Sequence, residues 1–204
     1  MGIDSLKSML GIFLDTETNG LNARAHRVLD IAMKIVDLET GREVEAYQTK
    51  VALSRELWDK SDPNSLRVNG YTWDEMQGAK PLEVVSQEII DLFSRLGVKR
   101  KKAVFICQNP SFDRAFFAQL VPPETQEMLS WPYHWLDLAS MHWALMLDRA
   151  KHKKAPLPWE TGYSKDMIAS YYRLPPEQKP HRAMNGVAHL FLCYSAAVGF
   201  PDNQ

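Results

Sequence analysis

The order of the apolar runs along the chain is the feature that most constrains its fold. Three strand-like segments come first, at 11–14, 28–36 and 43–51, and the turn Glu39-Thr40-Gly41 joins the second to the third. Short apolar or alternating runs bounded by polar turns are typical of strands, and neighbouring strands of this kind pair as an antiparallel meander. The second segment alternates with a period of two, which predicts a strand that is buried on one face only.

Helices and strands alternate after residue 80. Pro81 opens a segment whose apolar residues recur at helical spacing up to Gly97, and a short buried strand follows at 103–107. Asn109-Pro110 predicts a helix with Asn as its capping residue and Pro as its first helical residue. Four further elements are predicted: a strand at 133–136 and helices at 139–150, 164–172 and 181–198. We therefore expect one α/β domain over residues 1–204, with a mixed sheet flanked by helices.

Charge and cysteine content limit the classes of partner and the compartment. Lys and Arg number 24 against 25 Asp and Glu, so any binding of a polyanion must come from a local patch. Cys107 and Cys193 lie far apart in apolar runs, which argues against a disulfide framework or a zinc cluster and fits a reducing compartment. Residues 1–10 carry Asp4 and Lys7, unlike a signal peptide, and no apolar run approaches the ~18 residues that span a bilayer. We expect a cytoplasmic protein without a membrane partner.

Three groups of polar residues are candidates for chemistry. Asp15 and Glu17 end the first strand and, being two residues apart, point to one face, where their oxygens suit a hard divalent cation. Asp113 falls in the first turn of a helix, where the helix dipole favours its charge. His181 precedes Arg182 at the start of the last helix, where a phosphate can be received. Each group alone also fits a plain structural reading: a polar turn, a helix start or a surface histidine.

Taken together, these segments resemble one known family. The opening Ile12–Leu21 is similar to the motif Asp-x-Glu-Thr-x-Gly-Leu, and Asn109–Asp113 matches Asn-x-x-Phe-Asp. The order continues through Leu66–Thr72 before the second motif, Leu136–Leu138 after it, and Pro180–Met184 at the start of a third motif. In this order and spacing the chain resembles the DEDDh-type, DnaQ-like 3′-5′ exonucleases, which include proofreading subunits of bacterial replicative polymerases, ribonuclease T and TREX-type nucleases.

The resemblance implies an RNase H-like fold and a metal-dependent hydrolysis of phosphodiester bonds. It implies a cofactor of two divalent ions, Mg²⁺ or Mn²⁺. It also implies that the enzyme releases nucleoside monophosphates from the 3′ ends of single-stranded DNA or RNA. Asp15 would bridge both ions, Glu17 would bind one, and Asp113 would hold the second, mostly through water. His181 would be the catalytic general base, for which an unperturbed pKa of ~6.5 is suitable.

The resemblance also assigns substrate contacts. Thr16, Thr18 and Leu21 would line the turn that seats the terminal nucleotide. Asn109 and Phe112 would flank the penultimate nucleotide, with the Phe112 ring available for stacking. Whether the strand is DNA or RNA, and whether the protein is a monomer or a homodimer, is left open.

The chain departs from the family pattern at two positions. Gly186 stands where the third motif ends in Asp, five residues after His181, and Gln108 stands where the family usually has His. No acid lies between Glu177 and Asp202, so no acidic neighbour on the last helix can substitute. A helical glycine costs ~1 kcal/mol relative to Ala, which indicates an unusual backbone, close packing or relaxed selection.

Two functional readings follow from the missing acid. Mg²⁺ is commonly held by one or two protein carboxylates plus water and phosphate, so we expect weakened rather than abolished catalysis, and we expect Gly186→Asp to raise it. The alternative is a catalytically inactive exonuclease-like module that binds nucleic acid or protein.

Two basic runs complete the set of candidates. Lys99–Lys102 lies between a helix and a strand, and Arg149, Lys151, Lys153 and Lys154 lie beside Trp159 and before Tyr163. Such runs are usually solvated loops, and the alternative is contact with the phosphates of a single strand. The second run is the better candidate because it precedes the third motif.

Overall fold

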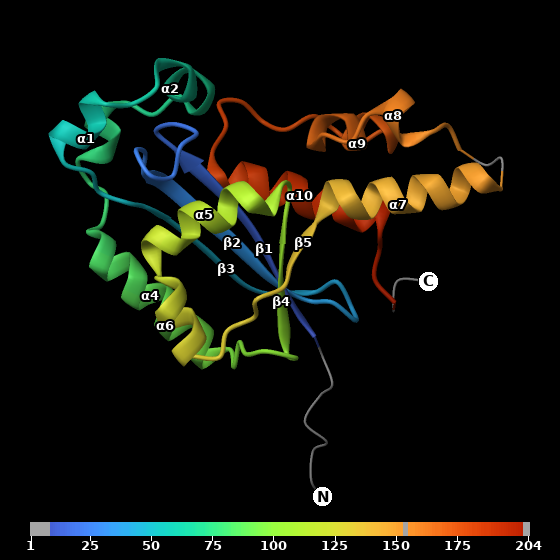
Figure 1. Ribbon diagram of the computed structural model, residues 1–204, viewed down its shortest axis with the longest axis horizontal. Helices are drawn as coiled ribbons and strands as arrows, with labels where there is room; N and C mark the ends of the chain where they lie inside the picture. Colours follow the sequence, from blue (N-terminus) through green and yellow to red (C-terminus); the bar gives the residue numbers. More distant parts are fainter. Residues whose placement is uncertain (1–8, 153–154, 202–204) are drawn as a thin grey trace, which may run out of the picture.

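The computed structural model describes residues 9–152 and 155–201, in which a five-stranded sheet is covered by helices on both faces (Figure 1). The strands, in the spatial order β3-β2-β1-β4-β5, are β3 (Glu43–Lys50), β2 (Val28–Asp37), β1 (Leu10–Thr18), β4 (Ala103–Cys107) and β5 (Trp135–Asp137). β2 pairs antiparallel with β1 and with β3, whereas β4 pairs parallel with β1 and with β5. The predicted α/β class, an antiparallel meander followed by parallel strands, is confirmed.

The helices of the described residues are α1 (Arg55–Asp59), α2 (Pro63–Asn69), α3 (Trp73–Met76), α4 (Leu82–Arg95), α5 (Pro110–Leu120), α6 (Pro123–Met128), α7 (Leu138–Lys151), α8 (Pro158–Thr161), α9 (Lys165–Tyr171) and α10 (Ala183–Ala197). The sequence predicted α4, α5, α7, α9 and α10 to within a few residues. It did not predict α1, α3, α6 and α8 because helices of four to six residues are too short to carry a periodic apolar pattern.

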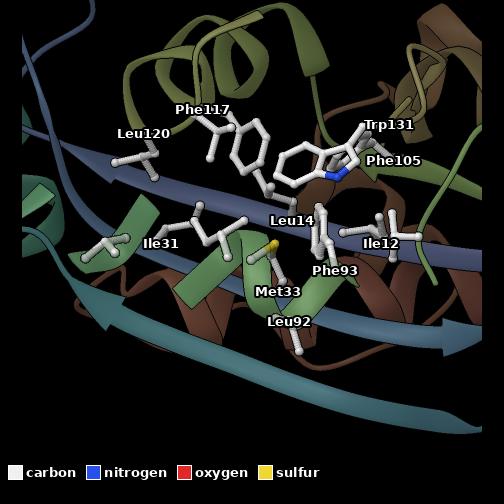
Figure 2. Packing of buried hydrophobic residues seen from close by; sticks show 14 of the residues in the cluster. Ile12, Leu14, Ile31, Met33, Leu92, Phe93, Phe105, Phe117, Leu120 and Trp131 are labelled. Atoms are coloured by element: carbon white, nitrogen blue, oxygen red, sulfur yellow. The ribbon is translucent and has the colours of Figure 1, made fainter. Parts of the chain in front are cut away.

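Two hydrophobic cores hold the layers together, one on each face of the sheet. On one face, Ile12 and Leu14 of β1 pack against Phe93 of α4 and Phe117 of α5 (Figure 2). On the other face, the alternate residue Phe13 packs against α7, α9 and α10, and its ring meets Phe191 and Tyr194 edge-on at 5.3 and 5.1 Å. β1 is therefore clamped between two helical layers, which fixes its end in place.

The prediction that β2 is buried on one face only is wrong. All residues from Val28 to Met33 are buried, including Asp30. β2 lies between β1 and β3, and both of its faces contribute to a core, with Ile31 on one side and Ala32 on the other. The alternation came from Asp30, which is buried, and from Lys34, which is half-buried.

Helices α5 and α10 begin at the same edge of the sheet, where β1 and β4 end. α5 starts three residues after the end of β4. The start of α10 is tied to β2, because the amide of Ala183 donates to Asp30 Oδ2 at 3.1 Å. The predicted start of this helix at 181 is wrong by two residues, so His181 lies in the loop before it.

No helix in residues 9–152 and 155–201 has the length and apolar character that crossing a bilayer requires.

Candidate active site

Three acidic side chains gather where β1 ends. Asp15 and Glu17 are half-buried in β1, and Asp113, from the first turn of α5, is only 3% exposed. Thr16, between the two acids, donates from its amide and its hydroxyl to Asp113 Oδ1, at 3.1 and 2.8 Å. These two hydrogen bonds fix the second predicted motif to the first, although 97 residues separate them in sequence.

Burial and mutual repulsion disfavour the charged forms of these acids. Burial raises the pKa of Asp15, although the charge of Lys165 opposes the rise. Burial and the charge of Asp15 raise the pKa of Glu17 to about 8 and raise that of Asp113 well above its usual value. Such a cluster is stabilised by a cation, and its carboxylate oxygens are the donors that Mg²⁺ and Mn²⁺ prefer.

Lys165 and Glu177 also belong to this cluster, although no sequence motif points to either residue. Lys165, the first residue of α9, places Nζ 3.5 Å from Asp15 Oδ1 and 2.9 Å from Glu177 Oε2. Burial alone would lower the pKa of Lys165, but Asp15 and Glu177 outweigh it and raise the pKa, so the side chain is an ammonium ion. Only the helix-capping Ser164 marks this position in sequence, and nothing marks Glu177.

Gly186 lies against Asp15, in an otherwise regular part of α10. A Cβ atom at 186 would lie 2.3 Å from Asp15 Oδ2, far inside van der Waals contact. Of the three explanations for this helical glycine, close packing is the one that the geometry supports. The expectation that Gly186→Asp raises activity therefore requires Asp15 to move first, because its carboxylate occupies the space that the new side chain needs.

His181 approaches the cluster from the loop before α10. Its Nδ1 lies 3.1 Å from Glu177 Oε1, and its amide donates to the carbonyl of Val68 in α2 at 3.3 Å. Glu177 is almost fully buried, with its other oxygen 3.7 Å from Nδ1 of His189. Glu177 thus lies between Lys165 and two histidines, and its Oε1 has no hydrogen-bond partner among the described residues.

A pocket of about 300 Å³ opens beside the acids. Its walls include Glu17 and four residues predicted to contact substrate, Thr16, Thr18, Leu21 and Phe112, together with residues of α2. A second pocket of about 440 Å³ adjoins it and is lined by Asn109, with Leu21 and Phe112 shared between the two. A larger pocket of about 920 Å³, lined by residues such as Phe191 and Phe200, has none of the four predicted metal and catalytic residues in its walls.

Asn109 occupies the N-cap position of α5, as predicted, but its side chain makes no capping hydrogen bond. Its backbone is left-handed with φ of 59°, and its side chain accepts from Ser111 Oγ at 2.7 Å instead of from a helix amide. Its own amide donates to Asp137 Oδ1 at 3.1 Å, and the side chain of Asp137 also caps α7. Gln108, at the other departure from the pattern, donates to the carbonyl of Tyr163 at 3.1 Å.

The basic runs contribute unequally to this edge of the sheet. Lys99–Lys102 precedes β4 and therefore lies at the opposite end of the sheet from the acids. Of the second run, Arg149 donates to the Tyr172 hydroxyl at 2.8 Å, and Lys153 and Lys154 lie outside the described residues. Trp159, beside this run, is 58% exposed, and its ring lies 5.7 Å from that of Trp143.

The fold and site together define a class of nuclease-like α/β proteins. A model of the exonuclease family RNase_T matches residues 12–187. The chain therefore belongs to this family, and the predicted DEDDh-type, DnaQ-like membership is confirmed.

Named relatives agree with this assignment. Ribonuclease T of Actinobacillus pleuropneumoniae is 28% identical over 114 residues, which are 54% of this chain and 52% of that protein. The chain thus spans about half the length of this curated relative. Among solved structures, the E. coli exonuclease I complex with single-stranded DNA gives a TM-score of 0.72 at 16% identity, covering 94% of this chain and 40% of that one. Cell-death related nuclease 4 gives 0.70 at 15% identity, covering 96% and 66%. These two likenesses concern the fold.

Proposed function

We propose that this protein is a metal-dependent 3′-5′ exonuclease that releases nucleoside monophosphates from single-stranded DNA or RNA ends. The observation that carries the proposal is the convergence of Asp15, Glu17, Asp113 and His181, from three separate segments, beside a pocket lined by Thr16, Thr18, Leu21 and Phe112. Family membership supports the same reaction class. The fold relatives include a 3′-exonuclease described in 3′-end recognition of a histone mRNA stem-loop, at a TM-score of 0.67 and 11% identity.

The donor set fits one divalent ion well. Asp15, Glu17 and Asp113 would hold it, and their raised pKa values are the electrostatic sign of carboxylates that a cation would stabilise. When bound, such an ion lowers the pKa of a coordinated water and offsets the charge of the phosphate. The carboxylate expected from position 186 is absent, and an ammonium group lies on the same side of Asp15.

His181 is placed for proton transfer. Nδ1 lies 3.1 Å from Glu177 Oε1, and we propose that in the substrate complex it donates a hydrogen bond to this carboxylate, which leaves the lone pair on Nε2. Nε2 would accept the proton of the attacking water, and Glu177 would stabilise the imidazolium ion that results. Leu21 and Phe112, which border both pockets, would separate the terminal nucleotide from the penultimate one.

The test is degradation of matched 5′-labelled DNA and RNA oligonucleotides in Mg²⁺ and in Mn²⁺. We expect stepwise shortening from the 3′ end that stops in EDTA. Asp113→Asn and His181→Ala should each slow it at least 100-fold, whereas the exposed Asp148→Asn should cleave at the parental rate. Parental rates in both site variants would contradict the proposal.

The second candidate is an inactive module that grips a strand end. The ion pair between Lys165 and Asp15 favours it, because a lysine neutralises the cluster without supplying a metal-bound water. This candidate predicts fluorescence-anisotropy binding of a 3′ end without product in either metal. It also predicts that Phe112→Ala weakens binding while Asp113→Asn leaves binding unchanged.

A further inference from the structure

We propose that Lys165 is a built-in cation that replaces one divalent ion of the acidic cluster, so that the folded chain binds a single divalent ion at Asp15. This inference rests on the proposed function in one respect, namely that the acidic cluster binds a divalent metal ion. The inference departs from the two-ion centre that the sequence resemblance implies, and it assigns a positioning role to Lys165 and Glu177.

The surroundings of the ammonium group are those of a bound cation. Lys165 Nζ contacts oxygens of Asp15 at 3.5 Å and Glu177 at 2.9 Å, and it donates to the carbonyl of Gly186 at 3.3 Å. Its side chain is only 13% exposed. An ammonium ion has three donors and no acceptor, and these three oxygens face it, with Glu177 Oε2 the closest.

Gly186 and Lys165 form one arrangement rather than two unrelated substitutions. The backbone of Gly186 accepts from Lys165, and the space that a side chain at 186 would need holds the carboxylate of Asp15. A carboxylate at 186 would therefore displace Asp15 from its contact with the ammonium ion. The missing acid and the added base occupy the same side of Asp15, and Glu177 supplies the counter-charge from the loop before α10.

The ammonium group also repels a second ion. A divalent ion placed between Asp15 and Glu177 would lie against a buried positive charge that both carboxylates already neutralise. Glu17 and the far oxygen of Asp113 are not in ion-pair contact with Lys165 in the described residues, which leaves the side of Asp15 nearer to them for one ion.

A neighbouring group of residues must not contribute to the number of divalent ions measured for the acidic cluster. Asp166, Glu177 and His189 place donor atoms within 4.8 Å of one another and could hold an ion of their own. The titrations are therefore made in an Asp166→Asn background, since Asp166 is exposed and is not part of the proposed site.

The experiment is a titration with Mn²⁺ by calorimetry and electron paramagnetic resonance, without substrate. In the Asp166→Asn chain we expect one ion and the spectrum of an isolated Mn²⁺. Lys165→Met, which frees Asp15 and Glu177, should bind two ions with the exchange-coupled spectrum of a pair ~4 Å apart. Lys165→Arg and the exposed Lys60→Met should each keep one.

A coupled pair in the parental background would overturn the proposal by itself, even if Lys165→Met failed to fold. So would a folded Lys165→Met chain that still binds one ion. The readout does not depend on turnover. A chain that binds one ion but degrades nothing sinks the proposed function alone, and a degrading chain with a coupled pair sinks only this inference.

Discussion

His142 is a buried histidine on α7 whose ring lies 5.8 Å from those of Tyr171 and Tyr172. Among the described residues, neither of its ring nitrogens has a hydrogen-bond partner. Burial lowers its pKa, and the charge of Arg149 lowers it further. The folded state therefore holds this imidazole neutral.

The buried neutral imidazole makes the unfolding free energy depend on pH, with the loss on the acidic side. Because the pKa of His142 is lower in the folded chain, the unfolded chain takes up this proton at a higher pH, so the contribution of His142 to stability is full above about pH 6.5 and is lost as the pH falls. We expect His142→Leu to flatten the loss of unfolding free energy between pH 6.5 and 5, as measured by urea titration. The exposed His134→Leu should keep the parental slope, and equal slopes in all three chains would contradict the prediction.

The sequence motifs were most informative about single residues of the candidate site. Four residues stand in short sequence motifs: Asp15, Glu17, Asp113 and His181. The residue types and the spacing of these motifs marked the four as candidates for one site. Lys165 and Glu177 stand in no such motif, and only folding brings them within 3.5 Å of their partners. The metal and catalytic roles of the identified residues stay predictions until the variants are measured.

At the scale of the element, the start of α10 depends on one buried carboxylate of β2. Asp30 Oδ2 accepts from the amide of Ala183 at 3.1 Å, the Tyr71 hydroxyl at 2.7 Å and Gln48 Nε2 at 3.0 Å. The Arg182 guanidinium lies over the Tyr71 ring at 3.8 Å. This contact holds the loop that carries His181 against the end of the sheet.

Asp30→Ala should release that end of the helix. Two buried donors, the Ala183 amide and the Tyr71 hydroxyl, and the exposed Gln48 lose their acceptor, so we expect a loss of about 3 kcal/mol in unfolding free energy and faster hydrogen exchange at the Ala183 amide. Exchange in the middle of α10, at Leu190, should change much less. An Ala183 amide that stays as protected as in the parent would show that the carboxylate does not hold the helix.

At the scale of the whole molecule, the two cores have different relations to the site. Phe93 lies in the α4–α5 layer against Trp131, with ring centroids 4.7 Å apart, whereas Phe13 joins β1 to α10 two residues before Asp15. The α10 layer sets the distance between Asp15 and Gly186, so its packing bears on the cluster directly.

Phe13→Ala and Phe93→Ala should each cost about 3–5 kcal/mol of unfolding free energy. In the folded fraction, only Phe13→Ala should weaken Mn²⁺ binding, by about tenfold, because it loosens α10 against Asp15. Calorimetry below the unfolding temperature separates the two effects. Equal weakening by both variants would mean that the site responds to overall stability rather than to the α10 layer.

The sequence by itself determined the meander, the alternation that follows it, and the family, because local apolar periodicity and short motifs survive in a linear reading. It did not reveal that β2 is buried on both faces, since alternation records polarity and not what packs on a strand. Only the tertiary structure showed which residues surround Asp15 on the side of position 186. Lys165 and Glu177 reach Asp15 from α9 and from the loop before α10, and contacts between such distant segments follow from packing rather than from any local pattern.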